Sequence, residues 1–246
     1  MRGNRIAVCS LLLVPMLLAK DWWMRKPYNT WSKQECREMM DDSPWSASET
    51  RHILRPDSST SGTGFGNGIN PDLGQPVTYH VRFLTAKPVR IAMARSMLID
   101  RGNEVNEATL ANLVGNSDEE NIVIALEIEV DHRFARFRDT LIELRTSDLI
   151  SNTYLKTDTG KVQFLRRYEP PGKDGSSAKF IFARRLADGT QFITAQDRKV
   201  HFDTDLEERQ SVRAPQPDFD VALPGSIRLS IMFDLRKMIF DGKLEI

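Results

Sequence analysis

The stretch WWMRKPYNTWSKQECREMMDDSPW, residues 22–45, contains all 4 tryptophans of the chain. Within it, Ser32 and Glu35 have the spacing of a capping box, in which each side chain accepts a backbone N–H at the start of a helix. Pro44 disfavours the helical conformation in the residue before it and so ends the helix. The pattern predicts a helix over residues 33–42.

This predicted helix must dock on a larger body. Cys36, Met39 and Met40 share one face at the i, i+3, i+4 spacing, and a helix of about ten residues is only marginally stable alone. Trp31 and Trp45 flank the helix, and we expect them to fasten it to the rest of the protein. Residues 20–55 are therefore interpreted as a Trp-rich helical arm.

The first 19 residues have the pattern of a signal peptide. Arg2 and Arg5 precede an apolar run over residues 6–18, which is shorter than the roughly 20 residues that span a bilayer. We expect cleavage near Ala19 and export to the periplasm or beyond the cell, with an uncleaved N-terminal anchor as the alternative. No later stretch predicts an integral membrane segment.

Charge and cysteine content narrow the class of protein. The 34 Lys and Arg residues balance 34 Asp and Glu residues, so the basic excess of a nucleic-acid-binding protein is missing and we expect no nucleic-acid partner. Of the 2 cysteines, Cys9 lies in the predicted signal peptide, which leaves Cys36 without a disulfide partner. Because Cys36 lies on the apolar helix face, we expect a buried, unreactive thiol.

Residues 56–75 are rich in Gly, Ser, Asn and Pro and predict a flexible loop. Its alternating glycines superficially resemble a phosphate-binding loop, but such a loop lies between a strand and a helix. Here Asn70 and Pro71 follow the glycines, so we expect no cofactor.

Residues 76–246 predict an α+β domain with a mostly antiparallel sheet packed by two or three helices. Residues 122–130 are apolar on both faces in their first half, which is typical of a central strand. Helices are expected over residues 88–102, over residues 107–114 and after Asp131. The other expected strands cover residues 77–84, 154–157, 162–168, 179–184, 191–194, 199–206 and 227–233.

Three segments carry a resemblance to known sequences. They are Trp31-Ser32 and Glu35 with the DSPW run at residues 42–45, the AKPVR run at residues 86–90, and FDLRKMIFDGKLEI at residues 233–246. Together they resemble a group of uncharacterised exported bacterial proteins of the kind common in acidobacteria. The resemblance implies export and a shared fold, and no particular chemistry.

The strongest metal-like run is His201, Asp203 and Asp205, which one strand would place on a single face. Neighbours on one strand face are roughly 6.5–7 Å apart, so three of them cannot share one ion without a bend. We therefore expect the solvent face of a strand whose Phe202 and Leu206 point inward, and no metal site.

Other chemistry-bearing residues remain open to two interpretations. Asp131 and His132 could join a Ser–His–Asp arrangement, although neither a Gly-x-Ser-x-Gly elbow nor a His-Glu-x-x-His motif occurs. Glu127 and Glu129 could act as acid and base, or simply face solvent. The arginine pairs at residues 166–167 and 184–185 could bind an anion or improve solubility. No catalytic residue can be assigned from the sequence.

Two functions remain as hypotheses. The first is a non-enzymatic exported binding or interaction domain of the envelope or periplasm, whose partner could be another envelope protein. The alternative is a secreted hydrolase that uses His132 or His201 with nearby aspartates. An interaction domain predicts an exposed apolar patch or open edge strand. An enzyme predicts a histidine, a carboxylate and a nucleophile or metal that converge.

Overall fold

The computed structural model describes residues 22–53, 75–102, 107–115, 118–131, 136–172, 176–207 and 226–246. It confirms the predicted α+β class. The helices are α1 (Lys33–Asp41), α2 (Lys87–Asp100), α3 (Glu107–Val114), α4 (Arg136–Glu143) and α5 (Thr146–Leu149), with short 3-10 turns η1 (Trp22–Met24), η2 (Tyr28–Thr30) and η4 (Leu235–Lys237). The strands are β1 (Ser46–Ile53), β2 (Gln75–Phe83), β3 (Asn121–Val130), β4 (Tyr154–Thr157), β5 (Val162–Phe164), β6 (Arg167–Glu169), β7 (Ala178–Ala183), β8 (Lys199–Glu207), β9 (Ser226–Asp234), β10 (Ile239–Phe240) and β11 (Lys243–Leu244).

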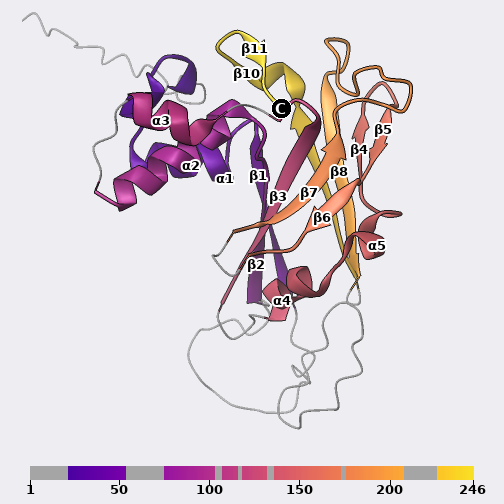
Figure 1. The fold of residues 1–246 in the computed structure, drawn as a ribbon. Coiled ribbons are helices and arrows are strands. Elements are labelled where there is room, and N and C mark those ends of the chain that lie inside the picture. Colours follow the sequence, from indigo (N-terminus) through magenta and orange to yellow (C-terminus); the bar gives the residue numbers. More distant parts are fainter. Residues whose placement is uncertain are drawn as a thin grey trace, which may run out of the picture.

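The strands form two main sheets and a small hairpin (Figure 1). One sheet has five strands in the order β1-β2-β3-β7-β6, and the other has four in the order β5-β4-β8-β9. All of their pairings are antiparallel. The apolar strand β3 is central in the larger sheet, as its sequence predicted. The predicted signal peptide and most of the Gly/Ser-rich loop lie outside the described residues.

The two sheets are joined where β5 runs into β6. The Leu165 N–H donates to the Thr153 carbonyl at 3.0 Å, whereas the next N–H, that of Arg166, donates to the Ile181 carbonyl at 2.8 Å. The first bond reaches the segment that leads into β4, and the second reaches β7. Consecutive residues of one continuous segment therefore pair with different sheets. The sheets are therefore one rolled antiparallel sheet that is open between β1 and β9. The sequence predicted a strand here but not its change of partner.

We call the opening between β1 and β9 the seam. At the seam, two charged side chains of the edge strand β1 point inward. Arg51 Nε donates to Glu49 Oε1 at 2.7 Å, and Arg51 Nη2 donates to the Arg228 carbonyl of β9 at 2.6 Å. The same guanidinium lies 5.9 Å from the centroid of the Tyr79 ring. Inward-pointing charges on an edge strand discourage pairing with other chains. Strand β1 was not predicted, because SASETRHI lacks the alternation of large apolar residues that marks a strand.

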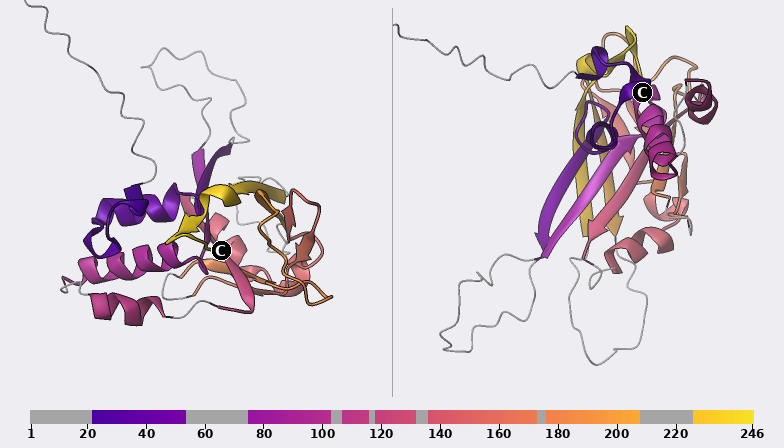
Figure 2. Two further views of the ribbon diagram at one scale, coloured as in Figure 1. Left: turned by 90° about the horizontal axis from the view of Figure 1, so that it is seen from above. Right: turned by 90° about the vertical axis from the view of Figure 1, so that its left-hand side faces the viewer.

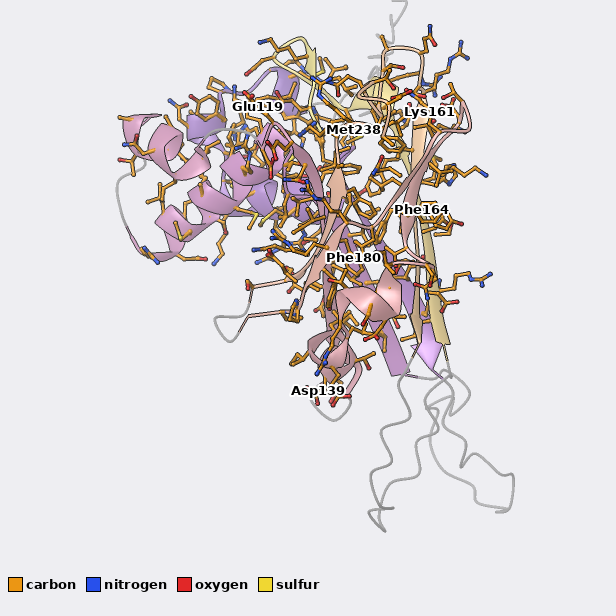
Figure 3. The ribbon with its side chains drawn as sticks, turned by 45° about the vertical axis from the view of Figure 1, so that its right-hand side comes forward. Glu119, Asp139, Lys161, Phe164, Phe180 and Met238 are labelled. Atoms are coloured by element: carbon orange, nitrogen blue, oxygen red, sulfur yellow. The ribbon has the colours of Figure 1, made fainter. Side chains whose placement is uncertain are left out.

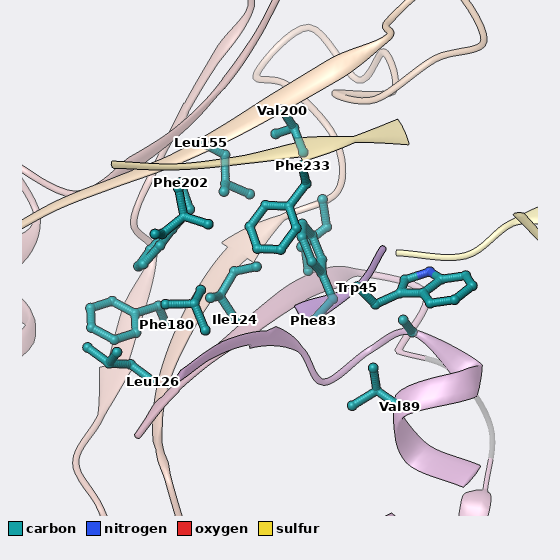
Figure 4. Close-up of a cluster of buried hydrophobic side chains, with 14 of the residues drawn as sticks. Trp45, Phe83, Val89, Ile124, Leu126, Leu155, Phe180, Val200, Phe202 and Phe233 are labelled. Atoms are coloured by element: carbon teal, nitrogen blue, oxygen red, sulfur yellow. The ribbon is translucent and has the colours of Figure 1, made fainter. Parts of the chain in front are cut away.

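Aromatic side chains from both sheets fill the space between them (Figure 4). Phe83 and Phe233 lie edge to face with centroids 4.9 Å apart, and Phe180 and Phe202 do so at 5.3 Å. Such geometry is preferred by aromatic rings and stabilises beyond the burial of area. Side chains alternate between the two faces of each strand, and the inward-facing positions carry these aromatic residues. The pairing register of each sheet then decides which of them meet in the core.

The tryptophans close one end of the rolled sheet. Trp31 and Trp45 are fully buried, and both rings lie edge to face on Phe240, with centroids 6.4 and 6.3 Å away. Phe240 belongs to the β10–β11 hairpin, whose turn has positive φ angles at Asp241 (51°) and Gly242 (75°). A two-residue hairpin turn requires these angles. The predicted docking by Trp31 and Trp45 is observed.

Helix α1 has the predicted cap and buried face. Ser32 Oγ accepts from the Glu35 N–H at 3.2 Å, and Glu35 Oε2 accepts from the Ser32 N–H at 2.6 Å. Cys36 is buried and unpaired, and burial raises the pKa of its thiol to about 11, which agrees with the unreactive thiol expected. Helices α1, α2 and α3 lie side by side as one layer (Figure 2). The start of the helix after Asp131 lies outside the described residues.

The strand expected over residues 191–194 is wrong. Only one bridge forms, between Arg185 and Gln191, because the following residues turn around the buried carboxylate of Asp197. That carboxylate accepts from the Thr194 N–H at 2.7 Å, from Lys161 Nζ at 2.7 Å and from Thr159 Oγ1 at 2.5 Å. Burial alone would raise the pKa of Asp197, but these donors outweigh it and hold the pKa far below its usual range.

Trp45→Ala should lower the free energy of unfolding by about 3–5 kcal/mol, because it empties a fully buried indole site. Each kcal/mol corresponds to roughly 2–4 °C of Tm in a chain of this size. Thermal unfolding followed by circular dichroism measures the change. Met24→Ala is the matched control, since Met24 is 64% exposed and its loss should change stability little. An unchanged Tm for Trp45→Ala would contradict the docking.

Asp197→Asn should destabilise the protein at neutral pH, with an effect that fades in acid. A carboxyl whose folded-state pKa is depressed contributes stability above its unfolded pKa of about 3.9 and loses it as the pH falls towards the folded pKa. Urea unfolding at pH 7 and pH 3 measures both. A stability gap between wild type and variant that stays constant between these pH values would show that the charge of Asp197 is not the cause.

Candidate functional site

Titratable side chains gather on the outer face of the five-stranded sheet. Strand β2 alternates, so that Tyr79 and Val81 are buried inside while His80 and Arg82 lie on the outer face. The antiparallel register places Ser48 of β1 opposite His80 on one side. We call the group Asp41, Ser48, His80, Arg82, Glu127 and Glu129 the polar cluster.

His80 is the centre of the polar cluster. Its Nδ1 lies 2.8 Å from Ser48 Oγ, and its Nε2 lies 3.0 Å from Glu129 Oε2. Asp41 Oδ1, at the end of α1, is 3.8 Å from Nδ1. The His80 side chain is 13% exposed while that of Glu129 is 75% exposed, so the imidazole is held beneath a solvent-facing carboxylate. A hydroxyl, an imidazole and a carboxylate are thus connected in series.

Arg82 extends the polar cluster along the same strand face. Its Nη2 donates to Glu127 Oε2 at 3.1 Å and, more weakly, to Asp41 Oδ1 at 3.4 Å. The side chain is 10% exposed, and its buried Nε has no hydrogen-bond partner among the described residues. Asp41 therefore contacts both His80 and Arg82 and fixes the end of α1 over the sheet.

The glutamates considered from the sequence as an acid–base pair have separate partners. Glu127 binds Arg82, whereas Glu129 binds His80. The arginine pairs also make contacts that hold the fold. Arg184 Nε donates to the Asp118 carbonyl at 2.8 Å, and Arg166 Nη1 donates to Asn121 Oδ1 at 3.3 Å.

The outer face of the four-stranded sheet contains the residues of the metal-like run. His201, Asp203 and Asp205 occupy alternate positions of β8, and Lys156 and Met232 pair with His201 on its two sides. The inward direction of Phe202 and Leu206 is confirmed, as both are buried. In the part of the chain that the structure describes, no group of three or more His, Cys, Asp or Glu side chains is arranged to hold a metal ion.

The hydrolase alternative also named His132. His132 lies outside the described residues. The polar cluster was not predicted from the sequence. The available signal was the alternation of His80 and Arg82 on β2. The contacts to Ser48 and Glu129, however, require the register of three strands.

An exposed apolar group marks the β4–β5 hairpin. Phe164 is 53% exposed and Val162 is 37% exposed. Phe164 points away from the interior (Figure 3), and its ring lies edge to face on that of Tyr154, with centroids 5.9 Å apart. We call Tyr154, Val162 and Phe164 the hairpin patch.

Comparisons with known proteins do not assign a function to either surface. No protein-family model, no curated protein and no solved structure matches the chain. None of the described helices has the length and apolar character needed to cross a membrane.

Proposed function

We propose that the protein is an exported binding domain that engages another protein of the cell envelope through the hairpin patch. The single observation that carries the proposal is the exposure of Phe164. Among the phenylalanines whose burial is described, Phe164 is the exposed one, while Phe83, Phe180 and Phe202 are fully buried. Burying such a side chain contributes about 1.5–3 kcal/mol, which a partner could supply.

The surroundings of the hairpin patch suit a protein partner. Lys156 pairs with Val162 across the hairpin, and Asp203 pairs with Tyr154 on the other side. An aromatic anchor inside a polar rim of both charge signs is the usual anatomy of a protein–protein interface. The formal net charge of zero disfavours nucleic acid as the partner.

Binding would proceed through side chains rather than by addition of a strand. The edge of β6 is capped by α5, because the Tyr168 N–H donates to Thr146 Oγ1 at 3.0 Å. The edge of β1 is protected by Arg51 and Glu49, which point inward at the seam. Strand β5 is only three residues long, so its exposed side chains offer more contact than its backbone.

Export rests on the signal-peptide pattern of residues 1–19, and the class of partner follows from it. A periplasmic or extracellular protein meets other envelope proteins first. The hydrolase alternative gains no support from His201, whose direct neighbours across the sheet, Lys156 and Met232, provide no nucleophile of the kind a hydrolase needs.

A photo-crosslinking amino acid at position 164 should capture one specific envelope protein in intact cells. The matched control is position 142, because Ile142 is 56% exposed but lies on α4, away from the hairpin. The captured protein is identified by mass spectrometry and then purified. Equal crosslinking from positions 164 and 142, or capture of a second copy of this chain, would contradict the proposal.

Binding of the purified partner then measures the contribution of the patch. Phe164→Asp should weaken the affinity at least tenfold, since a central aromatic anchor commonly contributes about 2 kcal/mol or more. Ile142→Asp should leave the affinity unchanged. Isothermal titration calorimetry gives both values, and wild-type affinity in Phe164→Asp would rule out the hairpin patch as the binding surface.

A further inference from the structure

We propose that Ser48, His80 and Glu129 form a nucleophile–base–carboxylate relay, in which Ser48 attacks small uncharged activated esters. The relay lies on the outer face of the five-stranded sheet, whereas the hairpin patch lies on the four-stranded sheet. The inference therefore goes beyond the proposed binding function and does not depend on it.

The distances are those expected of an activated serine. Ser48 Oγ lies 2.8 Å from His80 Nδ1, within hydrogen-bond reach of a general base, and His80 Nε2 lies 3.0 Å from Glu129 Oε2. Ser48 is exposed, so a small ester can reach its hydroxyl. The His80 ring is largely buried, which holds it in one orientation.

Hydrogen-bond chemistry determines which nitrogen acts as the base. A Glu129 carboxylate only accepts, so the contact at Nε2 requires a hydrogen on that nitrogen. In the neutral ring Nδ1 is then bare and accepts the Ser48 proton. A second arrangement also fits, in which the Ser48 hydroxyl donates to the Asp41 carbonyl at 2.9 Å and a charged ring donates to Ser48. The first arrangement activates Ser48, and the second does not.

Arg82 provides a positive charge beside the relay. It follows His80 by two residues on the same strand face, and Asp41 Oδ1 contacts both side chains. The positive charge of its guanidinium favours negative charge that develops nearby. Because the carboxylates of Asp41, Glu127 and Glu129 lie around His80 and Arg82, the site disfavours anionic substrates and favours uncharged esters.

The reaction is an acyl transfer in two stages. Ser48 Oγ forms a bond to the carbonyl carbon of the ester while His80 Nδ1 takes the hydroxyl proton. The bond to the leaving alcohol then breaks, and that alcohol takes the proton from Nδ1. Water repeats the sequence on the acyl-serine, which releases the carboxylic acid and restores Ser48.

A fluorophosphonate probe tests the nucleophile on the purified protein, and mass spectrometry identifies the labelled residue. The matched control within the chain is Ser230, an exposed serine on the outer face of β9. We expect the probe to label Ser48 at least tenfold faster than Ser230, and we expect the protein to hydrolyse p-nitrophenyl acetate. Labelling at position 48 and ester hydrolysis should both be lost in Ser48→Ala. Equal labelling of the two serines would overturn the proposal.

Two further variants separate activation from folding, each checked by its thermal unfolding. His80→Gln should slow labelling of Ser48 at least tenfold. Glu129→Gln removes a carboxylate that is 75% exposed, so the fold should persist while the midpoint of the pH–rate profile moves to lower pH. A labelling rate unchanged in folded His80→Gln, or an unmoved profile in Glu129→Gln, would show that these contacts only hold the strands together.

Discussion

The indole of Trp45 joins the segments that the rest of the structure depends on. Its ring lies edge to face on Trp23 and Phe240, with centroids 5.9 and 6.3 Å away, and its Nε1 donates to the Glu245 carbonyl at 2.8 Å. The Trp45 carbonyl accepts from the Phe83 N–H at 2.9 Å, where β1 begins to pair with β2. One residue thus ties the helical arm, the seam strand and the C-terminal hairpin together.

This attachment places the two surfaces that could carry function. With the arm docked, the end of α1 brings Asp41 over the outer face of the five-stranded sheet, beside His80 and Arg82. On the four-stranded sheet, Phe164 remains exposed on the β4–β5 hairpin. The same alternation of side chains that fills the core therefore leaves a polar network on one outer face and an aromatic patch on the other.

Structural features that depend on residues close together in the sequence could be predicted from it. Features that depend on which strands pair with each other could not. The α1 cap needs only Ser32 and Glu35, and the apolar run of β3 indicates its central position without any partner. Strand β1 is polar and exists because it pairs with β2. The contacts of His80 join residues 32 and 49 positions apart in the sequence, so they follow only from the register. The contact of Phe164 with Tyr154 likewise follows from the pairing of β5 with β4, which no local pattern encodes.

Native-state hydrogen exchange tests most directly whether the arm and the rolled sheet form one cooperative unit. The Cys36 amide in α1 donates to the Ser32 carbonyl at 2.9 Å, and the Leu84 amide after β2 donates to the Val123 carbonyl of β3 at 2.8 Å. If Trp45 fastens the arm, both amides should exchange with the same opening free energy, equal to that of global unfolding. Exchange of the Cys36 amide at a much lower free energy, with the Leu84 amide still protected, would show that the arm detaches from an intact sheet.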